Sequence, residues 1–378
     1  MAPVTVFRLI LIGIGIGAMF AAVLALARRK MTETLCLVWG FLALVFIAAG
    51  ILLHPAGWKQ YLSNEGLALI VMAGVCLLTA AYFISVGISD LLCRMRETAI
   101  QISLLRLESE LLKNGEGKRK DKDLLVIIPA FNEEDNLPVL LRGLKEEGVG
   151  TFADVLVIDD GSTDRTHQKA QEMSCLCISG IFHQGYGSAL LTGYKYAVKE
   201  GYSYVIQMDA DGQHDICNIR ALYKALQEKD DAGRRPDIVL GSRFMQGGSA
   251  FPVSRVRMFA IRIFRLFLQI AAGRRITDPT SGLQGLNSRT AAFYSRYGCF
   301  DNEYPDANII LQMLFLGYEI REIPAVMHAR RSGKSMHSGI KPLIYMFRMA
   351  FSMSAVYIRK KLLRKEWVAD EECVERDV

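Results

Sequence analysis

The chain has 378 residues, of which 51% are apolar, and its formal net charge is +6. This apolar share is above that of most soluble enzymes, so we expect part of the chain to lie in lipid. The 8 cysteines include no CxxC pair, which argues against a zinc site and against a disulfide framework. The basic excess would suit nucleic acid, an anionic membrane surface or phosphorylated ligands, and the placement of the basic residues must decide between them.

Three apolar segments dominate the first quarter of the chain, at about residues 4–27, 35–53 and 67–88. Each is close to the ~20 residues that a helix needs to cross a bilayer. The first has no basic leader and no convincing small-residue cleavage site, so we interpret it as a retained anchor and not as a signal peptide. Residues 1–96 are therefore predicted to form a transmembrane anchor of three helices.

Basic residues flank these spans unevenly. They follow the first and third spans as Arg28, Arg29, Lys30, Arg94 and Arg96, whereas the loop 54–65 contains only Lys59. Cytoplasmic flanks are the ones enriched in Lys and Arg. We therefore expect a multi-pass integral membrane protein with its N-terminus outside and everything after Asp90 in the cytoplasm. Gly13, Gly17 and Ala21, spaced four apart on the first span, would allow homo-oligomers to form.

The next residues predict a short connection to a second domain. Residues 97–112 carry apolar side chains at helical spacing, namely Ile100, Leu104, Leu107 and Leu111, and a polar, charged run continues to residue 122. We interpret 97–122 as an amphipathic helix and linker. The predicted second domain is 123–338, followed by membrane-interface helices at 339–365 and a disordered acidic tail at 366–378.

Strand and helix patterns alternate through the second domain. The predicted strands are residues 124–128, 154–158, 175–181, 204–208 and 237–240, and the clearest helices are 137–147 and 187–200. This repetition predicts an α/β fold in which helices cover both faces of a mostly parallel sheet. Such sheets bind ligands at the carboxyl ends of their strands.

Polar clusters follow two consecutive predicted strands. The first strand leads into Pro-Ala-Phe-Asn-Glu-Glu at 129–134, and the second ends in Asp-Asp-Gly-Ser-Thr-Asp at 159–164. A carboxylate after a strand is often only a helix cap, and Ser162 or Asp164 could serve in that way. Two such clusters on one rim could instead hold a ribose and a base.

A third cluster, Asp209-Ala210-Asp211-Gly212-Gln213-His214, follows the strand 204–208. Asp209 and Asp211, with the oxygen of Gln213, could bind one Mg²⁺ or Mn²⁺ and leave positions open for water and phosphate. Surface turns also carry this pattern routinely, but the position after a strand favours the metal site. His214 could be a further ligand, and we favour its packing against the turn.

Four motifs in this order resemble the family 2 glycosyltransferases of GT-A fold. They are PAFNEE at 129–134, IDDGSTD at 158–164, MDADGQHD at 208–215 and GSRF at 241–244. The chain is most similar to the polyprenyl-phosphate branch, which is dolichyl-phosphate mannose synthase-like, over about residues 124–338. The anchor is similar to a three-helix membrane family of unknown function that often accompanies such enzymes.

The resemblance implies duties for particular residues. Donor contacts would come from Pro129, Ala130, Asn132, Glu133, Asp160, Gly185, Gly187 and Asp209, while Asp209, Asp211 and Gln213 would bind the metal that bridges the donor diphosphate. His183-Gln-Gly-Tyr-Gly187 matches the Asn-x-Gly-x-Gly stretch of the family, with His183 where Asn is usual. The nucleobase and the sugar, a UDP-hexose or GDP-mannose, are left open.

Basic side chains supply candidates for binding phosphate. Arg243 follows the fifth strand, Arg255 lies in a stretch that the family shares, and residues 330–335 resemble the loop that closes over the phosphates. A guanidinium can hold phosphate oxygens with two hydrogen bonds, so we expect Arg243, Arg255, Arg331 and Lys334 to bind phosphate or acceptor. The alternative for 330–335 is a solvated basic loop. Residues 255–275 and 340–365 mix basic and aromatic residues, which indicates helices in the headgroup layer or ordinary amphipathic core helices, and not a nucleic-acid surface.

The resemblance implies an inverting transfer of a sugar to a polyprenyl phosphate at the cytoplasmic face. A phosphate acceptor is mostly dianionic at neutral pH and needs little general base, whereas a sugar hydroxyl would need one, for which Asp306 is the candidate. Asp306 could equally be a carboxylate at a helix N-terminus. The alternatives are a transferase acting on a sugar hydroxyl in envelope polysaccharide or glycolipid, and a non-catalytic nucleotide-sugar-binding scaffold.

Overall fold

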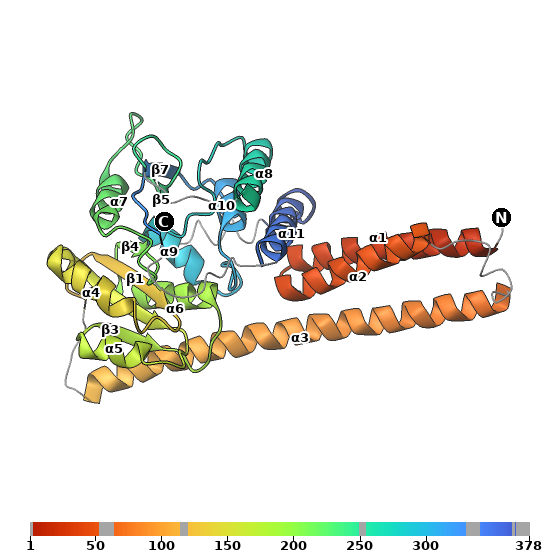
Figure 1. Cartoon of the computed structure of the whole chain (residues 1–378), viewed down its shortest axis with the longest axis horizontal. Helices are drawn as coiled ribbons and strands as arrows, with labels where there is room; N and C mark the ends of the chain where they lie inside the picture. The colour runs from red at the N-terminus through yellow and green to blue at the C-terminus, as the bar shows by residue number, and fades with distance from the viewer. Residues whose placement is uncertain are drawn as a thin grey trace. The chain divides into compact units, whose positions relative to one another are not determined.

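The computed structural model describes residues 3–52, 64–113, 120–248, 255–329, 341–364 and 367. The chain forms two compact units (Figure 1). The first consists of Met1–Met95 and Ile344–Glu366, and the second of Arg96–Leu343 and Trp367–Val378.

The first unit is helical. It contains α1 (Pro3–Ala27), α2 (Glu33–Leu52), the first part of α3 (Asn64–Lys113) and nearly all of α11 (Lys341–Leu362). Gly15 lets α1 approach α2 closely, because a Cβ there would lie 2.7 Å from the carbonyl oxygen of Ala43. Three helices of the described chain, α1, α2 and α3, are long and apolar enough to cross a membrane, as the sequence predicted.

The helix α11 is anchored to the same unit by polar and apolar contacts. Phe351 and Ile358 pack against the apolar cluster around Ala22 and Trp39. The Arg359 guanidinium donates to the carbonyl oxygen of Ala27 at 3.0 Å, which satisfies one of the carbonyl groups left open at the end of α1.

The helix α3 corrects one predicted boundary. Residues 67–88 and 97–112 were expected to be separate helices, but α3 runs without a break from Asn64 to Lys113. No proline or glycine occurs between Gly87 and Gly115 to stop it, and the charged residues between the two patterns fit a helix, since Asp90 and Arg94 pair at 2.9 Å.

Within the described residues, the second unit holds a seven-stranded sheet in the order β3-β2-β1-β4-β6-β5-β7. The strands are β1 (Leu124–Ala130), β2 (Ala153–Asp159), β3 (Leu176–Ser179), β4 (Tyr204–Gln207), β5 (Ile238–Ser242), β6 (Gln284–Asn287) and β7 (Ile320–Pro324). Only β6 of these is antiparallel, and it pairs with both β4 and β5. The predicted mostly parallel α/β fold is confirmed, although β6 and β7 were not predicted.

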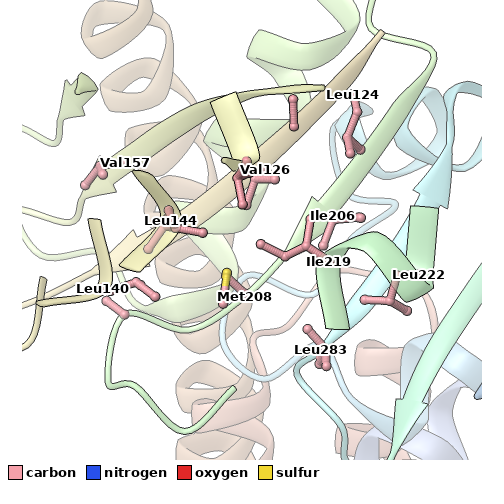
Figure 2. Packing of buried hydrophobic residues seen from close by; sticks show 14 of the residues in the cluster. Leu124, Val126, Leu140, Leu144, Val157, Ile206, Met208, Ile219, Leu222 and Leu283 are labelled. Carbon is pink, nitrogen blue, oxygen red and sulfur yellow. The ribbon is translucent and has the colours of Figure 1, made fainter. Parts of the chain in front are cut away.

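Helices cover both faces of this sheet. They are α4 (Leu137–Glu146), the 3₁₀ turn η2 (Val149–Thr151), α5 (Thr166–Glu172), α6 (Tyr186–Glu200), α7 (Cys217–Gln227), α8 (Arg255–Ala272), α9 (Ser288–Ser295) and α10 (Ala307–Phe315). Leu124, Val126 and Ile128 of β1 pack with α4 and α7 in one core (Figure 2). Ile127, which points to the other face because side chains alternate along a strand, meets α6 at Gly193.

The C-terminal end of α3 is part of this second unit and not a free linker. Its apolar face is buried at Ile100, Leu104 and Leu107. Two ion pairs join it to α6, Glu97 with Lys195 at 2.8 Å and Glu108 with Lys199 at 2.5 Å.

Trp367 also belongs to the second unit. Its side chain is buried and makes an edge contact with Phe315, with ring centroids 6.0 Å apart. The disorder predicted for 366–378 therefore does not extend to Trp367, and the rest of that tail lies outside the described residues.

Candidate active site

The carboxyl ends of β1 and β2 bring the first two polar clusters together. The strands are parallel and in register, with Ala130 opposite Asp159. Beyond them, the Asn132 backbone N–H donates to the hydroxyl of Ser162 at 3.0 Å, and the Asn132 side-chain oxygen accepts from the Thr163 N–H at 2.9 Å. Asn132 has φ +54°, a left-handed conformation that asparagine tolerates better than most residues.

Glu133 is turned toward the interior of this junction. Its carboxylate accepts from the Asn136 side chain at 2.6 Å, and its backbone N–H donates to the Thr166 hydroxyl at 2.8 Å. Pro129 and Ala130 are buried at the end of β1. Pro129, Ala130 and Glu133, which were predicted to contact the donor, are therefore buried beneath the site. Asn132 is exposed at its surface.

Asp160 organises the loop that precedes α6. Its two oxygens accept from the backbone N–H groups of Gln184 and Gly185 at 2.9 and 2.8 Å. His183 Nδ1 lies 2.8 Å from the same carboxylate. Asp160 is only 5% exposed, and this burial raises the pKa of its carboxyl, with the hydrogen bonds acting in the opposite direction.

His183 also meets the first cluster. Its ring stacks on Phe131, with centroids 3.8 Å apart and planes at 23°. The 183–187 loop is thereby tied to both polar clusters, through Asp160 on one side and Phe131 on the other.

The two glycines of this loop have separate structural reasons. Gly185 has φ +103°, which other residues rarely adopt. Gly187 is packed against backbone, since a Cβ there would lie 2.8 Å from the carbonyl oxygen of Asn302. The Ser188 N–H donates to that same oxygen at 3.0 Å. The segment after α9 is thus fixed beside the loop.

The third cluster meets the loop through a tyrosine. The Tyr186 hydroxyl donates to Asp209 Oδ1 at 2.9 Å. Burial, followed by the charge of Asp209, raises the pKa of Tyr186 well above its ordinary value, so this side chain stays a neutral donor. Two residues on, Asp211 accepts from the Gln213 N–H at 3.0 Å, which closes the turn.

His214 supports this turn from inside. Its Nδ1 accepts from the Asp209 N–H at 3.1 Å, and it forms an antiparallel bridge with Met327. Burial lowers the pKa of His214 to about 4, so the ring is neutral at physiological pH. The packed role expected for His214 agrees with this geometry.

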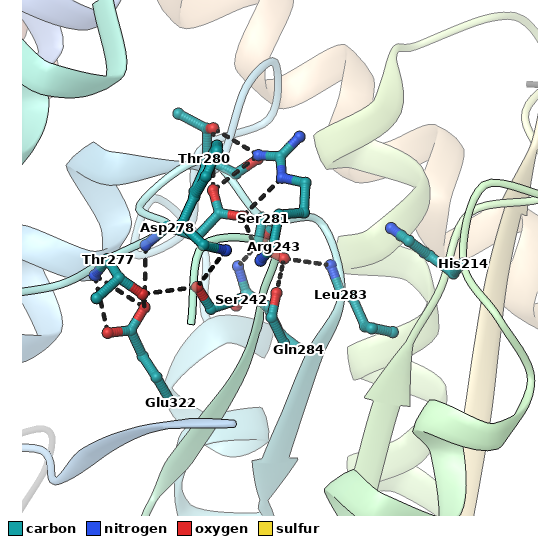
Figure 3. A network of polar contacts seen from close by, with 12 residues as sticks. His214, Ser242, Arg243, Thr277, Asp278, Thr280, Ser281, Leu283, Gln284 and Glu322 are labelled. Carbon is teal, nitrogen blue, oxygen red and sulfur yellow. Dashed lines mark hydrogen bonds and ion pairs between the residues drawn. The ribbon is translucent and has the colours of Figure 1, made fainter. Parts of the chain in front are cut away.

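Arg243 and Asp278 form a buried ion pair (Figure 3). Arg243 donates to both oxygens of Asp278, at 2.6 and 2.7 Å, and to the hydroxyl of Thr280 at 2.9 Å. Glu322 in turn accepts from the backbone N–H groups of Thr277 and Asp278. The network fixes the segment 277–282 against the end of β5.

The same segment reaches the metal turn. A Cβ on Gly282 would lie 3.1 Å from the Tyr186 hydroxyl and 3.3 Å from Asp209 Oδ2. The clusters that follow β1, β2, β4 and β5 thus form one continuous site.

Comparison with known proteins agrees with this arrangement. Residues 125–306 match the model described as glycosyl transferase family 2. An uncharacterized protein of Methanocaldococcus jannaschii is 30% identical over 180 residues, which cover 47% of this chain and 71% of that protein. The chain belongs to glycosyl transferase family 2.

Two further relatives carry functional names. The undecaprenyl-phosphate mannosyltransferase of Micrococcus luteus is 28% identical over 222 residues, covering 57% of this chain and 88% of that protein. The polyprenol monophosphomannose synthase of Mycolicibacterium smegmatis is 28% identical over 244 residues, covering 61% and 87%. The glycosyltransferase described here is similar to both across most of its second unit.

Asp209, Asp211 and Gln213 fit a hard divalent cation in this glycosyltransferase. Among the residues that the structure describes, no group of three or more His, Cys, Asp or Glu side chains is placed to hold a metal. Mg²⁺ is commonly held by one or two carboxylates together with substrate phosphates.

The structure corrects the role predicted for Arg243. Its side chain is 4% exposed and its guanidinium is engaged by Asp278 and Thr280, so it is not open to a substrate phosphate. Arg255 is the exposed first residue of α8 and stays a candidate. Arg331 and Lys334 lie outside the described residues.

Asp306 is the residue that precedes α10. Its side chain makes no capping hydrogen bond there. Its charge contributes to raising the pKa of Tyr186, after burial and Asp209, which places it within electrostatic reach of that hydroxyl. The role of base stays a prediction.

Sequence reasoning missed Tyr186 and Asp278. Tyr186 occupies a variable position of the His-Gln-Gly-Tyr-Gly stretch, where only the glycines were considered. Asp278 opens the run Asp-Pro-Thr-Ser-Gly at 278–282, whose turn-forming residues mark a structured loop. Neither pattern states which distant residue it would contact.

Proposed function

We propose that this glycosyltransferase moves a sugar from a nucleotide-sugar to a polyprenyl phosphate at the cytoplasmic face of a membrane. The observation that carries the proposal is the convergence of Asn132, Asp160 and Asp209 on one rim of the sheet, linked through the 183–187 loop. The acceptor class is supported by two relatives named for polyprenyl or undecaprenyl phosphate. Three helices able to cross a membrane fit a lipid acceptor.

In this proposal the rim of β1 and β2 holds the nucleoside and the turn after β4 holds the diphosphate. Asn132 is exposed on the rim and lies against the 162–163 turn, so its amide can reach a ribose or base. Asp160 acts by keeping the 183–187 loop in shape. A divalent ion bound by Asp209, Asp211 and Gln213 would neutralise charge on the departing nucleoside diphosphate.

The acceptor phosphate oxygen attacks the anomeric carbon from the face opposite the leaving group. The new carbon–oxygen bond forms as the bond to the diphosphate breaks, so the configuration inverts. A phosphate monoester is mostly dianionic at neutral pH, with a second pKa near ~6, and needs little proton removal. Asp306 would matter for the alternative acceptor, a sugar hydroxyl, which needs a base to remove its proton.

The decisive test is transfer of radiolabelled sugar by purified full-length protein in detergent. UDP-hexoses and GDP-mannose are each offered with polyprenyl phosphate and Mn²⁺. We expect label to enter the organic phase with one donor, and Asp211→Ala to lower the rate by about 100-fold or more. Asp231→Ala, in an exposed turn outside the site, should transfer at the wild-type rate.

Other outcomes separate the alternatives. Transfer to a sugar hydroxyl, but not to any lipid phosphate, would replace the proposed acceptor and give Asp306 its role as base. Binding of nucleotide-sugar without transfer to any acceptor would favour the alternative of a non-catalytic nucleotide-sugar-binding scaffold.

A further inference from the structure

Arg265 of α8 has buried donor groups without partners. Its Nε and Nη2 atoms are enclosed, yet among the described residues neither has a hydrogen-bond acceptor. Buried polar groups are nearly always paired, and a guanidinium that loses water without gaining an acceptor is costly. An anion bound at Arg265 would supply the missing hydrogen-bond acceptor.

The neighbouring Arg243 has the hydrogen-bond acceptors that Arg265 lacks. Arg243 and Arg265 lie near the same ring, Phe244, with their guanidinium carbons 5.5 and 4.6 Å from its centroid. Arg243 donates to Asp278 through both Nε and Nη2, whereas Arg265 packs on the ring and its Nε and Nη2 have no acceptor. The Arg243 guanidinium is therefore paired within the protein, whereas the Arg265 guanidinium has donors that a ligand would pair.

The nearby acids are already engaged. Asp278 accepts from Arg243, and Glu322 accepts from the N–H groups of Thr277 and Asp278. Burial lowers the pKa of Arg265, and Arg275 and Arg243 add to this effect, while Asp278 and Glu322 oppose it. Three arginines near two occupied carboxylates leave an excess of positive charge that an incoming anion would balance.

The outer surface of α8 indicates the kind of anion. Exposed apolar side chains recur along the helix at spacings of three and four, namely Val256, Phe259, Ile263, Leu266 and Ile270. The opposite face is buried at Ile261, Phe264 and Leu268. Arg265 follows Phe264 and precedes Leu266, so it lies on the flank between the buried and the exposed apolar faces. A ligand there would meet a cation and an apolar surface together.

We propose that Arg265 binds the phosphate of the lipid acceptor, whose apolar chain follows the exposed face of α8. The proposal rests on the proposed function for the identity of the acceptor. It adds a phosphate contact that Arg243, closed by Asp278, does not provide.

The test compares Arg265→Gln with Arg262→Gln, which removes an exposed arginine from the same helix. Full-length proteins in a non-ionic detergent are heated with and without farnesyl phosphate, farnesol, inorganic phosphate or phosphatidylglycerol, in the absence of any donor. We expect farnesyl phosphate to raise the melting temperature of the wild type and of Arg262→Gln, and not that of Arg265→Gln. Without ligand, Arg265→Gln should melt at or above the wild-type temperature, because it removes an unpaired charge.

Kinetics provide the second arm. Arg265→Gln should raise KM for polyprenyl phosphate by about tenfold or more and leave KM for the nucleotide-sugar unchanged, since a charge-assisted phosphate contact contributes about that factor. Arg265→Lys keeps the charge but not the forked arrangement of donors, so its KM for polyprenyl phosphate should lie between those of the wild type and Arg265→Gln.

Several results would overturn the assignment. An unchanged response of Arg265→Gln to farnesyl phosphate would exclude the site, and a large loss of stability without ligand would make Arg265 structural. An equal response to inorganic phosphate or to phosphatidylglycerol would mean a free anion or a membrane headgroup and not the acceptor. If the wild type transferred no sugar to polyprenyl phosphate, the proposed function would fall, while the donor-free melting experiment would still decide the binding site.

Discussion

The two oxygens of Asp209 face different groups. Oδ1 accepts from the Tyr186 hydroxyl at 2.9 Å, while Oδ2 lies 3.7 Å from His214 Nε2, beyond hydrogen-bonding distance. Oδ1 is therefore oriented by a neutral donor, which fixes the carboxylate that would bind the metal. Groups that orient a metal-binding carboxylate in this way typically change metal affinity when they are removed.

Tyr186→Phe is expected to weaken Mn²⁺ binding by about tenfold, because Asp209 loses the hydrogen bond that fixes its rotamer. Calorimetric titration of the protein with Mn²⁺ in the presence of nucleoside diphosphate measures this directly. Tyr297→Phe, an exposed tyrosine, provides the control. Equal affinities for Tyr186→Phe and wild type would show that the turn holds Asp209 without help.

His214 should make the metal-free protein sensitive to acid. Its pKa is lowered by burial from 6.5 to about 4, so the unfolded chain takes up a proton before the folded chain does. The stabilisation is complete above pH 6.5 and is lost as the pH falls toward 4, in total by about 3 kcal/mol.

His214→Asn keeps an acceptor but cannot titrate, and it should remove most of that pH dependence. Thermal melting in a chelating buffer between pH 7 and pH 4.5 measures it. If the two proteins lost stability in parallel over this range, the acid sensitivity would have another source.

At the scale of elements, the 183–187 loop and the start of α6 contact three other segments of the chain. Asp160 holds its backbone, Phe131 covers His183, and Asn302 accepts from Ser188 on the far side. A close backbone approach is possible only because residue 187 has no side chain. Donor binding and the position of the 301–306 segment should therefore change together.

Gly187→Ala is predicted to cost about 1–3 kcal/mol of stability, since its methyl group would overlap the backbone of Asp301 and Asn302. We also expect a higher KM for the nucleotide-sugar. Gly150→Ala is a matched control, because a Cβ there would have no neighbour within 4 Å. Melting curves and initial rates measure both effects. Equal behaviour of the two variants would contradict the claim that the close backbone approach at residue 187 requires glycine.

The sequence predicted the elements that carry repeating apolar patterns. The buried strands β1 and β2 were located to within two residues at each end, because continuous apolar runs are typical of parallel strands covered on both faces. The strand β6, Gln-Gly-Leu-Asn, has one large apolar residue and no such pattern. Its place between β4 and β5 is set by tertiary pairing, which local sequence does not encode.

At the scale of the whole molecule, the site was predictable where topology brings motifs together. Asn132, Asp160 and Asp209 follow parallel neighbouring strands, so their approach follows from the fold class. Arg243 was misjudged because its partner Asp278 is 35 residues away and no spacing rule links them. The continuity of α3 was missed because a change from apolar to charged residues was taken as an end of the helix.

The unbroken course of α3 has a consequence for where the enzyme can be divided. The region shared with the family begins at residue 125, but the compact unit begins at Arg96, inside a helix. A fragment cut at the family boundary would lack the buried side chains of Leu104 and Leu107, and its Lys195 and Lys199 would lose their acidic partners. The region that matches the family is therefore shorter than the compact second unit, which also includes the end of a helix that begins in the apolar N-terminal segment.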